Sequence, residues 1–306
     1  MQSLSAEERR TRTPAGVEVA YHLIGQRPED GAPAILLANG LGGSWRAWSH
    51  QLRQMQDRFR FVSWDYRGLY GSPRPPSLER LDPRAQAEDG LAILDGERID
   101  GAVVIGWSMG VQVALEIARL APARVRALVL INGVAGRPWD TLGGGPVLGR
   151  LAPHALRAAR SVPDLLHAGT MKAVSWPGTP RWIQRLGLAS RTIDLDLFHT
   201  LAGSFEDLDM EVYVETLRQL GEHDAHDVLD GISVPTLLVA GSKDLMTPRA
   251  SFERIARRVP HAELLVVPGG THYLAIEYPE VVNLRIERFF RQHGLGPSEA
   301  PRGATP

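Results

Sequence analysis

One short stretch, residues 103–111, constrains the fold of this chain more than any other. A β-branched apolar run breaks into Gly-x-Ser-x-Gly at residues 106–110 and then continues with helical spacing. This is the sequence form of a tight strand-to-helix turn that exposes the hydroxyl of its serine, here Ser108. The serine must adopt a strained backbone conformation, and a Cβ at Gly106 or Gly110 would collide with the neighbouring strand and helix. Since the five-residue pattern is common, its meaning depends on whether a base, an acid and oxyanion donors occur elsewhere in the chain.

Strand and helix patterns alternate through most of the chain. Apolar runs without alternation, such as residues 34–38, are typical of strands buried on both faces of a parallel sheet. Strands are predicted at residues 17–24, 34–38, 59–64, 102–107, 127–131, 236–240 and 263–267, and helices at 45–55, 83–94, 249–259 and 279–292 and directly after Ser108. This alternation predicts the α/β class, with a mostly parallel sheet wrapped by helices.

A long helical segment interrupts this alternation. Residues 136–228 contain no strand signal and carry short helical patterns instead, whereas usual connections in α/β units have roughly 2 to 6 residues. We therefore expect an inserted all-helical segment at 136–228, between the two parts of a core at 1–135 and 229–293. A turn is predicted at 28–31, and the tail at 294–306, rich in Gly, Pro and Ser, is predicted to be disordered.

Composition narrows the classes of function. The chain has 306 residues, of which 43% are hydrophobic, enough for one large α/β domain with an insertion or for two domains. Its net charge of -1 provides no global basic field of the kind that would favour nucleic acid or an anionic membrane. Since no cysteine is present, disulfides, thiol catalysis and cysteine-ligated metals are excluded. Residues 1–12 are polar and no apolar run reaches the roughly 20 residues of a membrane span, so we expect a cytoplasmic protein without a signal peptide; the oligomeric state stays open.

Three polar side chains follow predicted strands. Ser108, Asp244 and His272 each lie in the loop directly after one. Such loops gather at the carboxyl ends of parallel strands, so we expect the three side chains to lie close together. A serine nucleophile needs a base that takes its proton and a third group that holds the base in the correct tautomer. The order Ser, Asp, His along the chain is also the order that this type of turn carries.

With these motifs the chain resembles the α/β-hydrolase superfamily, in particular its serine esterase and lipase-like members with a helical cap. The resemblance runs from about residue 17 to residue 292 outside the insertion. It implies an α/β-hydrolase fold in which Ser108 is the nucleophile, His272 the general base and acid, and Asp244 the orienting carboxylate. In some members the acid follows an earlier strand. That place here holds Asn132, which favours Asp244, with Asp140 as a distant second choice.

The resemblance also implies an oxyanion hole made by the backbone N–H groups of Leu41 and Met109. Two positions depart from the family pattern. The family's usual His-Gly at the glycine-rich turn is Asn39-Gly40 here, and Tyr70 stands where the D-x-R-G-x-G-x-S turn has its second glycine. A backbone donor does not depend on the side chain at position 39, so the hole can form. Tyr70 either narrows the mouth of the pocket or points outward.

Candidate residues for the lining of a substrate pocket are Asn39, Tyr70, Trp107 and Trp139. Five aromatic residues of the insertion are expected to be a mixture: some line the pocket and others form the insertion's own core. They are Trp139, Trp176, Trp182, Phe198 and Phe205. The polar run at 222–227 has side chains suited to zinc, but it is more typical of a linker into the next strand. We therefore expect no metal and no cofactor, and a small molecule as the binding partner.

The resemblance implies a serine hydrolase that cleaves carboxylic esters of small to medium hydrophobic substrates through an acyl-enzyme. Three alternatives stay open: a carbon–carbon bond hydrolase acting on dienoates, a cofactor-free perhydrolase, and a hydrolase-like receptor for small molecules. Arginines that bind a carboxylate near the pocket would favour the first, and Arg46, Arg67 and Arg137 are the candidates. Ser108 excludes epoxide hydrolases and haloalkane dehalogenases, which use an aspartate nucleophile on this fold.

Overall fold

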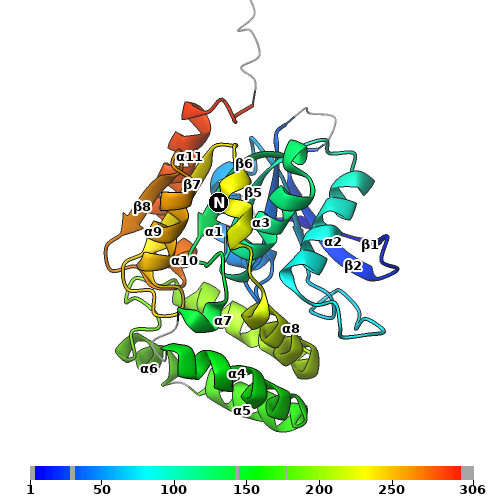
Figure 1. Cartoon of the computed structure of the whole chain (residues 1–306), viewed down its shortest axis with the longest axis vertical. Coiled ribbons are helices and arrows are strands. Elements are labelled where there is room, and N and C mark those ends of the chain that lie inside the picture. Colours follow the sequence, from blue (N-terminus) through cyan, green and yellow to red (C-terminus); the bar gives the residue numbers. More distant parts are fainter. Residues whose placement is uncertain (1–3, 28–31, 142–144, 177, 298–306) are drawn as a thin grey trace, which may run out of the picture.

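A mixed sheet runs through the middle of the protein (Figure 1). The structure, a computed structural model, describes residues 4–27, 32–141, 145–176 and 178–297. Within these ranges eight strands pair in the order β1-β2-β4-β3-β5-β6-β7-β8. The predicted turn at 28–31 and the tail beyond residue 297 lie outside the described residues. The strands are β1 (Ala6–Arg12), β2 (Glu18–Gly25), β3 (Ala34–Ala38), β4 (Arg60–Trp64), β5 (Ala102–Trp107), β6 (Val125–Ile131), β7 (Thr236–Gly241) and β8 (Glu263–Val267).

Most of the sheet is parallel. Parallel pairs join β4, β3, β5, β6, β7 and β8, whereas β2 pairs antiparallel with both β4 and β1. Strands β3, β4 and β7 are buried along their whole length, as expected for strands covered on both faces. These observations confirm the predicted α/β fold class.

Helices cover both faces of the sheet. One hydrophobic cluster packs α1 (Ser49–Met55) and α11 (Pro279–Gln292) against one face. A second cluster packs α2 (Pro83–Gly96), α3 (Met109–Leu120) and α9 (Arg249–Arg258) against the other. A 3-10 turn, η2 (Trp45–Trp48), precedes α1, and the short α10 (Leu274–Glu277) precedes α11.

Strand β1 is an element that the sequence did not predict. It pairs with β2 along its whole length, from Ala6 opposite Ile24 to Arg12 opposite Glu18. Its residues are mostly charged and exposed, so they show neither an apolar run nor alternation. The charges pair with neighbours: Arg9 with Glu97 at 2.9 Å and Arg10 with Glu18 at 3.2 Å. A strand at the edge of a sheet tolerates such a composition.

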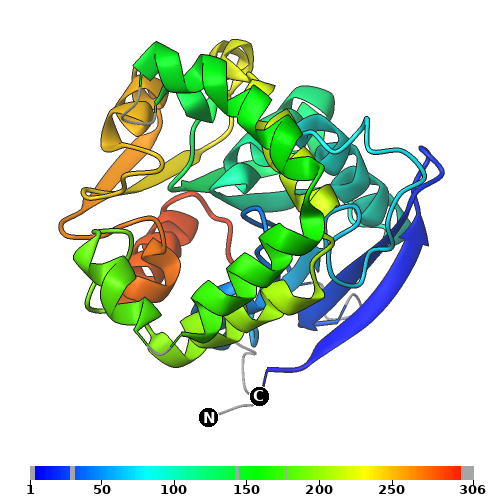
Figure 2. The same ribbon diagram turned by 90° about the horizontal axis from the view of Figure 1, so that it is seen from below.

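Between β6 and β7 the described residues form helices and turns but no strand. In Figures 1 and 2 these helices lie together over one end of the sheet, with α4, α5 and α6 farthest from it. In the part of the chain that the structure describes, no helix has both the length and the apolarity needed to cross a membrane. The helices are α4 (Gly145–Arg160), α5 (Pro163–Ser175), α6 (Thr179–Arg185), α7 (Leu195–Gly203) and α8 (Met210–Glu222).

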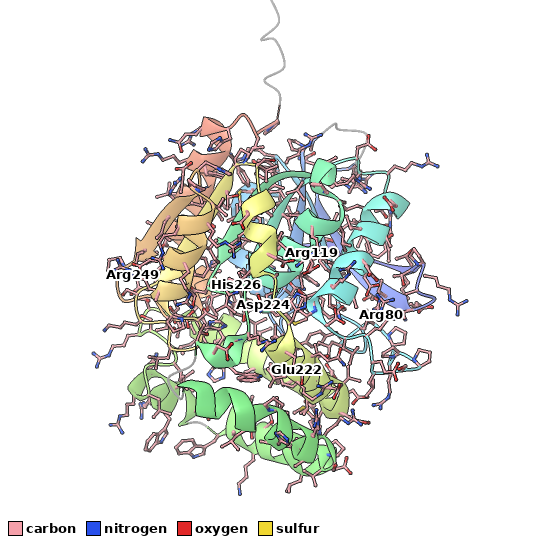
Figure 3. The ribbon with its side chains drawn as sticks, viewed as in Figure 1. Arg80, Arg119, Glu222, Asp224, His226 and Arg249 are labelled. Carbon is pink, nitrogen blue, oxygen red and sulfur yellow. The ribbon has the colours of Figure 1, made fainter. Side chains whose placement is uncertain are left out.

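The polar run at 222–227 joins α8 to η6 (His226–Gly231), and Figure 3 labels Glu222, Asp224 and His226 within it. Its side chains pair with different partners. Glu222 pairs with Arg218 at 2.8 Å, and Asp224 with His226 at 2.9 Å. Asp227 accepts two hydrogen bonds from Arg119 of α3, at 2.6 and 2.7 Å. The described residues contain no group of three or more His, Asp or Glu side chains that could hold a metal ion.

The turn between β5 and α3 depends on two glycines. Ser108 has φ 57° and ψ -117°, the strained backbone expected for this turn. A Cβ at Gly106 would lie 2.2 Å from the carbonyl oxygen of Gly110, and one at Gly110 would lie 2.0 Å from that of Ala38. The predicted collisions with helix and strand are confirmed, and both involve backbone atoms that cannot rotate away.

We expect Gly110→Ala to lower the free energy of unfolding by about 3 kcal/mol, because α3 and β3 must separate to admit the methyl group. Urea unfolding measures the change. Gly96→Ala is the matched control, since Gly96 ends α2 and a Cβ there meets no atom within 4 Å. The control should be neutral or stabilising by up to about 1 kcal/mol. Equal effects at the two positions would contradict the packing argument.

Candidate functional site

Ser108, His272 and Asp244 meet at the carboxyl end of the sheet. The Oγ atom of Ser108 lies 2.9 Å from Nε2 of His272, and Nδ1 of the same ring lies 2.9 Å from Oδ2 of Asp244. His272 and Asp244 are buried, at 4% and 5% exposure. If Nδ1–H donates to the carboxylate, Nε2 is left as an acceptor for the serine hydroxyl. This geometry can raise the nucleophilicity of the hydroxyl.

Asp244 is held in place by its own loop. Its Oδ1 accepts hydrogen bonds from the N–H groups of Met246 and Thr247, at 2.8 and 2.9 Å, and its Oδ2 accepts one of 2.6 Å from the Thr247 hydroxyl. Burial raises the pKa of Asp244, but the facing His272 and these hydrogen bonds outweigh burial, so the pKa lies below its ordinary value. The carboxylate therefore stays ionised beside the imidazole.

Two buried polar residues, Asn132 and Glu277, connect the loops of the site, a role that the sequence did not predict for either. Asn132, after β6, accepts a 2.8 Å hydrogen bond from the N–H of Gly241 and donates one of 2.5 Å to the carbonyl of Thr271. Glu277 accepts hydrogen bonds from the N–H groups of Thr271 and Ser190, both at 2.8 Å. The sequence signal for each is a polar residue next to apolar ones: Asn132 directly follows the apolar strand β6, and Glu277 ends the short, otherwise apolar helix α10.

The glycine-rich loop at residues 40–43 packs against the serine turn. A Cβ at Gly40 would lie 3.0 Å from the indole of Trp107 and 3.3 Å from Cβ of Ser108, so a side chain there would push the loop away. Leu41 follows directly and lines the same cavity as Ser108. Met109 is the first residue of α3, whose opening N–H groups lack partners within the helix. Both residues therefore line the cavity beside Ser108, and their part in an oxyanion hole stays a prediction.

Asn39 does not line the cavity beside Ser108, contrary to the prediction. Its side chain is buried at 1% exposure. The amide donates to the carbonyl of Trp64 at 3.0 Å and accepts from Nε1 of Trp48 at 2.8 Å. The hydroxyl of Tyr66 donates to the Asn39 carbonyl at 2.6 Å. Asn39 therefore braces the start of the glycine-rich loop, because its side chain points toward the strand and helix behind it.

Tyr70 likewise lies outside that cavity and lines a separate polar cleft beside His22 and Asp65. Its backbone has φ 51°, which is the left-handed conformation that favours glycine. Its hydroxyl donates to the carbonyl of Gly42 and lies 3.3 Å from Oγ of Ser204 in the insertion. Burial raises the pKa of Tyr70 to about 12, so the hydroxyl keeps its proton. Tyr70 neither narrows the cavity mouth nor points outward, but joins the glycine-rich loop to the insertion.

A cavity of about 320 Å³, the large cavity, lies between the sheet and the insertion and contains Ser108 and His272 in its wall. This volume is within the range of ligand sites. No Asp, Glu, Lys or Arg lines it within the described residues. Trp176 and Trp182 are not part of its wall and are half exposed. Its aromatic lining consists of Trp107, Trp139, Phe198, Phe205, Tyr213 and Tyr273.

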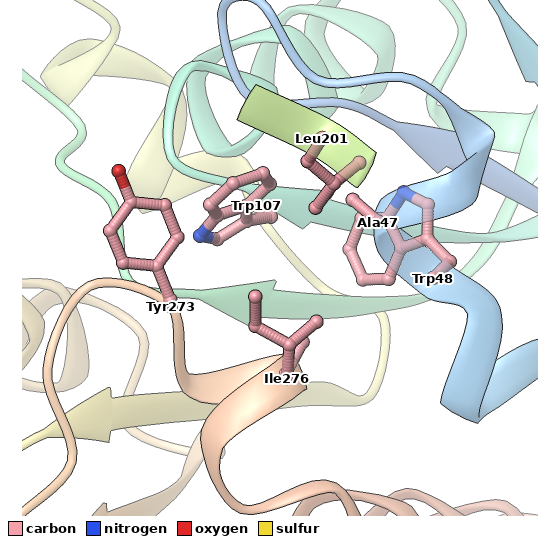
Figure 4. A pocket seen from close by; sticks show the side chains of 7 residues that line it. Ala47, Trp48, Trp107, Leu201, Tyr273 and Ile276 are labelled. Carbon is pink, nitrogen blue, oxygen red and sulfur yellow. The ribbon is translucent and has the colours of Figure 1, made fainter. Parts of the chain in front are cut away.

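A smaller apolar cavity, about 10 Å³, lies beside the large one (Figure 4). Trp107, Leu201 and Tyr273 line both cavities and so form the wall between them. The rings of Trp107 and Tyr273 lie 6.0 Å apart, and Nε1 of Trp107 donates to the carbonyl of His272 at 2.9 Å. Trp107, predicted as a pocket residue, thus also holds the backbone of His272.

The three candidate arginines lie elsewhere. Arg67 is buried and donates two hydrogen bonds to Asp89, at 2.6 and 2.7 Å. Arg46 lines the polar cleft beside Tyr70, and its guanidinium lies 4.8 Å from the ring centroid of Trp45. Arg137 is exposed and does not line the large cavity. None of them is placed to bind a substrate carboxylate next to Ser108.

The chain is similar to known proteins over most of its length. The protein named "Putative carbamate hydrolase RutD" of Caulobacter sp. (strain K31) is 28% identical over 279 residues, which cover 89% of this chain and 96% of that protein. The enol-lactonase of Burkholderia xenovorans LB400 superposes with a TM-score of 0.74 at 22% identity, over 92% of this chain and 100% of that one. A thermophilic esterase of Thermogutta terrifontis gives 0.73 at 22% identity, over 94% and 99%.

The two solved structures share the fold with this chain, and their low identity supports no more than that. The family comparison goes further. Residues 35–285 match the "Alpha/beta hydrolase family", a span that includes the serine turn, the Asp244 loop and His272. Since the match extends over far more than half of the 306 residues, the chain belongs to the alpha/beta hydrolase family.

Proposed function

We propose that the protein is a serine hydrolase that cleaves carboxylic esters of small to medium hydrophobic substrates through an acyl-enzyme. The observation that carries the proposal is the chain of two 2.9 Å contacts from Ser108 through His272 to Asp244, which opens into an apolar cavity. The helices between β6 and β7 act as a cap over that cavity. Their residues, Phe198 and Phe205 among them, form part of its wall and exclude water from it.

In the first half of the reaction, Oγ of Ser108 attacks the ester carbonyl while Nε2 of His272 takes the hydroxyl proton. The carbonyl π electrons move onto oxygen, and the N–H groups of Leu41 and Met109 stabilise that negative charge. As the tetrahedral intermediate collapses, the bond to the alcohol oxygen breaks and His272 gives its proton to the leaving alkoxide. Asp244 stabilises the imidazolium throughout and is not itself protonated.

In the second half, a water molecule attacks the acyl-enzyme in place of the alcohol. His272 takes a proton from that water, and the same two N–H groups hold the second oxyanion. Collapse breaks the bond to Oγ of Ser108, which recovers its proton from His272. The carboxylic acid leaves, and the site returns to its starting state.

The uncharged wall of the cavity favours a neutral substrate. A dienoate would bring a carboxylate into a space where the described residues supply no arginine or lysine, at a desolvation cost that nothing offsets. The relatives named for carbamate hydrolysis suggest a second acyl class. A small carbamate would fill little of a cavity of about 320 Å³, whereas an ester with a hydrocarbon chain would remove much of its apolar surface from water.

Ser108→Ala should lower the rate of p-nitrophenyl butyrate hydrolysis by at least about 10³-fold, because no other group can form the acyl-enzyme. The free energy of unfolding should stay unchanged, since alanine keeps the Cβ of the turn. Ser77→Ala, at an exposed position away from the cavity, is the control and should keep full activity. Residual turnover close to the native rate would overturn the assignment of the nucleophile.

The kcat/KM for p-nitrophenyl esters should rise about three- to fourfold per added methylene until the cavity is full, as each buried methylene contributes about 0.8 kcal/mol. Val174→Phe should end this rise at a shorter chain, because Val174 lines the cavity. Val162→Phe, at an exposed position outside the cavity, should leave the optimum unchanged. The same measurements should include a dienoate, an aryl carbamate and an assay for peroxyacid formation. A kcat/KM for any of these reactions higher than that for the best p-nitrophenyl ester would contradict ester specificity.

Tyr70→Phe should lower kcat by about tenfold with little change in KM, because removal of the hydroxyl frees Gly42 and loosens the loop that presents Leu41. Steady-state kinetics with one short ester measures both constants. Tyr66→Phe removes a hydroxyl that bonds to the Asn39 carbonyl at the start of the same loop and is a useful comparison. An unchanged kcat in Tyr70→Phe would show that the hydroxyl does not position the loop.

A further inference from the structure

The outermost layer of the insertion carries large apolar side chains in solvent. Helix α5 has two different sides. Thr170 and Val174 line the large cavity, whereas Leu165 and Lys172, seven residues apart, share the other side of the helix. Leu165 is 71% exposed. Trp176, which follows α5 on the same side, is 50% exposed, so this side of the helix presents apolar surface to solvent.

Helix α6 and the Asp244 loop continue this surface. Trp182 of α6 is 49% exposed, and its ring lies 6.5 Å from that of Trp176. Leu186, one turn later, is also exposed. Leu245 of the Asp244 loop adjoins the residue after Leu186, because its Cδ1 lies 3.8 Å from the position that a Cβ would take at Gly187. We call the side chains of Leu165, Trp176, Trp182, Leu186 and Leu245, with the cations Lys172, Arg181 and Arg185, the outer face.

The charge around the outer face is mostly positive. Residues 151–192 contain six cations and one acid, Asp164, although the whole chain has a net charge of -1. Arg160 pairs with Glu215 of α8 at 3.1 Å. The other five are exposed and form no ion pair with a described residue: Arg157, Lys172, Arg181, Arg185 and Arg191. Arg185 instead lies 5.9 Å from the ring of Trp182. Elsewhere in the chain exposed arginines such as Arg74, Arg80 and Arg249 pair with carboxylates, whereas these five cations are available to an anionic partner.

We propose that the outer face docks on the surface of an anionic phospholipid bilayer. Exposed tryptophans and leucines bury their apolar parts at the level of the headgroups, while unpaired lysine and arginine side chains contact the anionic phosphates. Half-exposed indoles and an exposed leucine flanked by unpaired cations are the composition typical of a surface that binds in the headgroup layer. The contact is peripheral, since no described helix can span a membrane.

The outer face adjoins the wall of the large cavity, so docking would bring the cavity next to the bilayer. Leu245 belongs to the outer face, and the next residue, Met246, lines the large cavity. Both belong to the loop that carries Asp244. Met246 is 44% exposed, so the wall of the large cavity reaches the surface beside Leu245, where a hydrophobic molecule in the bilayer would enter. The docking goes beyond the proposed function and does not rest on it, because binding is measured without turnover.

Vesicle co-sedimentation with the full chain tests this proposal. We expect binding to vesicles of phosphatidylcholine mixed with phosphatidylglycerol, weak binding to phosphatidylcholine alone, and a decrease as salt is raised. Trp176→Ser with Trp182→Ser, and separately Arg181→Glu with Arg185→Glu, should each weaken binding by at least about tenfold. All of these variants should hydrolyse a short soluble ester at the native rate, as none of the four residues lines the large cavity.

Helix α11 offers the matched control, because Leu284 and Arg288 place an exposed leucine and an exposed cation one turn apart on the core. Leu284→Ser with Arg288→Glu should bind vesicles like the native chain. Absence of binding to the mixed vesicles, or native binding by the double tryptophan variant, would overturn the proposal. So would a native dimer that the tryptophan variant converts to a monomer in analytical ultracentrifugation. Vesicle binding without ester hydrolysis would contradict only the proposed function.

Discussion

The close approach of α3 to β3 is the constraint on which the candidate site depends. Because position 110 has no side chain, the first turn of α3 sits directly on the backbone of Ala38. That contact holds Ser108 at φ 57° and directs its hydroxyl away from the sheet. Position 40 follows the same rule, since its missing Cβ lets the glycine-rich loop touch the serine turn. The reactive geometry thus arises from backbone packing at positions without side chains.

Buried polar residues then join the strand ends into one unit. Asn132 connects the ends of β6 and β7 to the loop before His272, and Glu277 connects that loop to Ser190 of the insertion. Tyr70 makes a corresponding link between Gly42 and Ser204. The insertion therefore contacts both the loop that carries His272 and the glycine-rich loop at residues 40–43. A displacement of the insertion would therefore move both loops, which lie on either side of Ser108.

The sequence predicted the buried parts of the fold most accurately, and the reasons are physical. β3 and β5 begin and end at the predicted residues, and nearly all of their residues are buried. β1 escaped prediction because an edge strand needs no apolar face. Ser108, Asp244 and His272 could be chosen from their places after strands, although only the parallel order of the sheet brings them together. Asn39 and Tyr70 were misplaced because the direction of a side chain in a loop depends on neighbours distant in sequence.

The composition of β1 also bears on how copies of this protein meet. An outer strand exposes a row of unsatisfied N–H and C=O groups, to which a strand of a second molecule could add. Glu7, Glu8, Arg9 and Arg10 place four successive charges along that row, and several are engaged with partners of the same molecule. A second strand that paired with this edge would place its own side chains beside those charges and strip water from them. Extension into a continuous intermolecular sheet is thereby opposed at the β1 edge of the sheet.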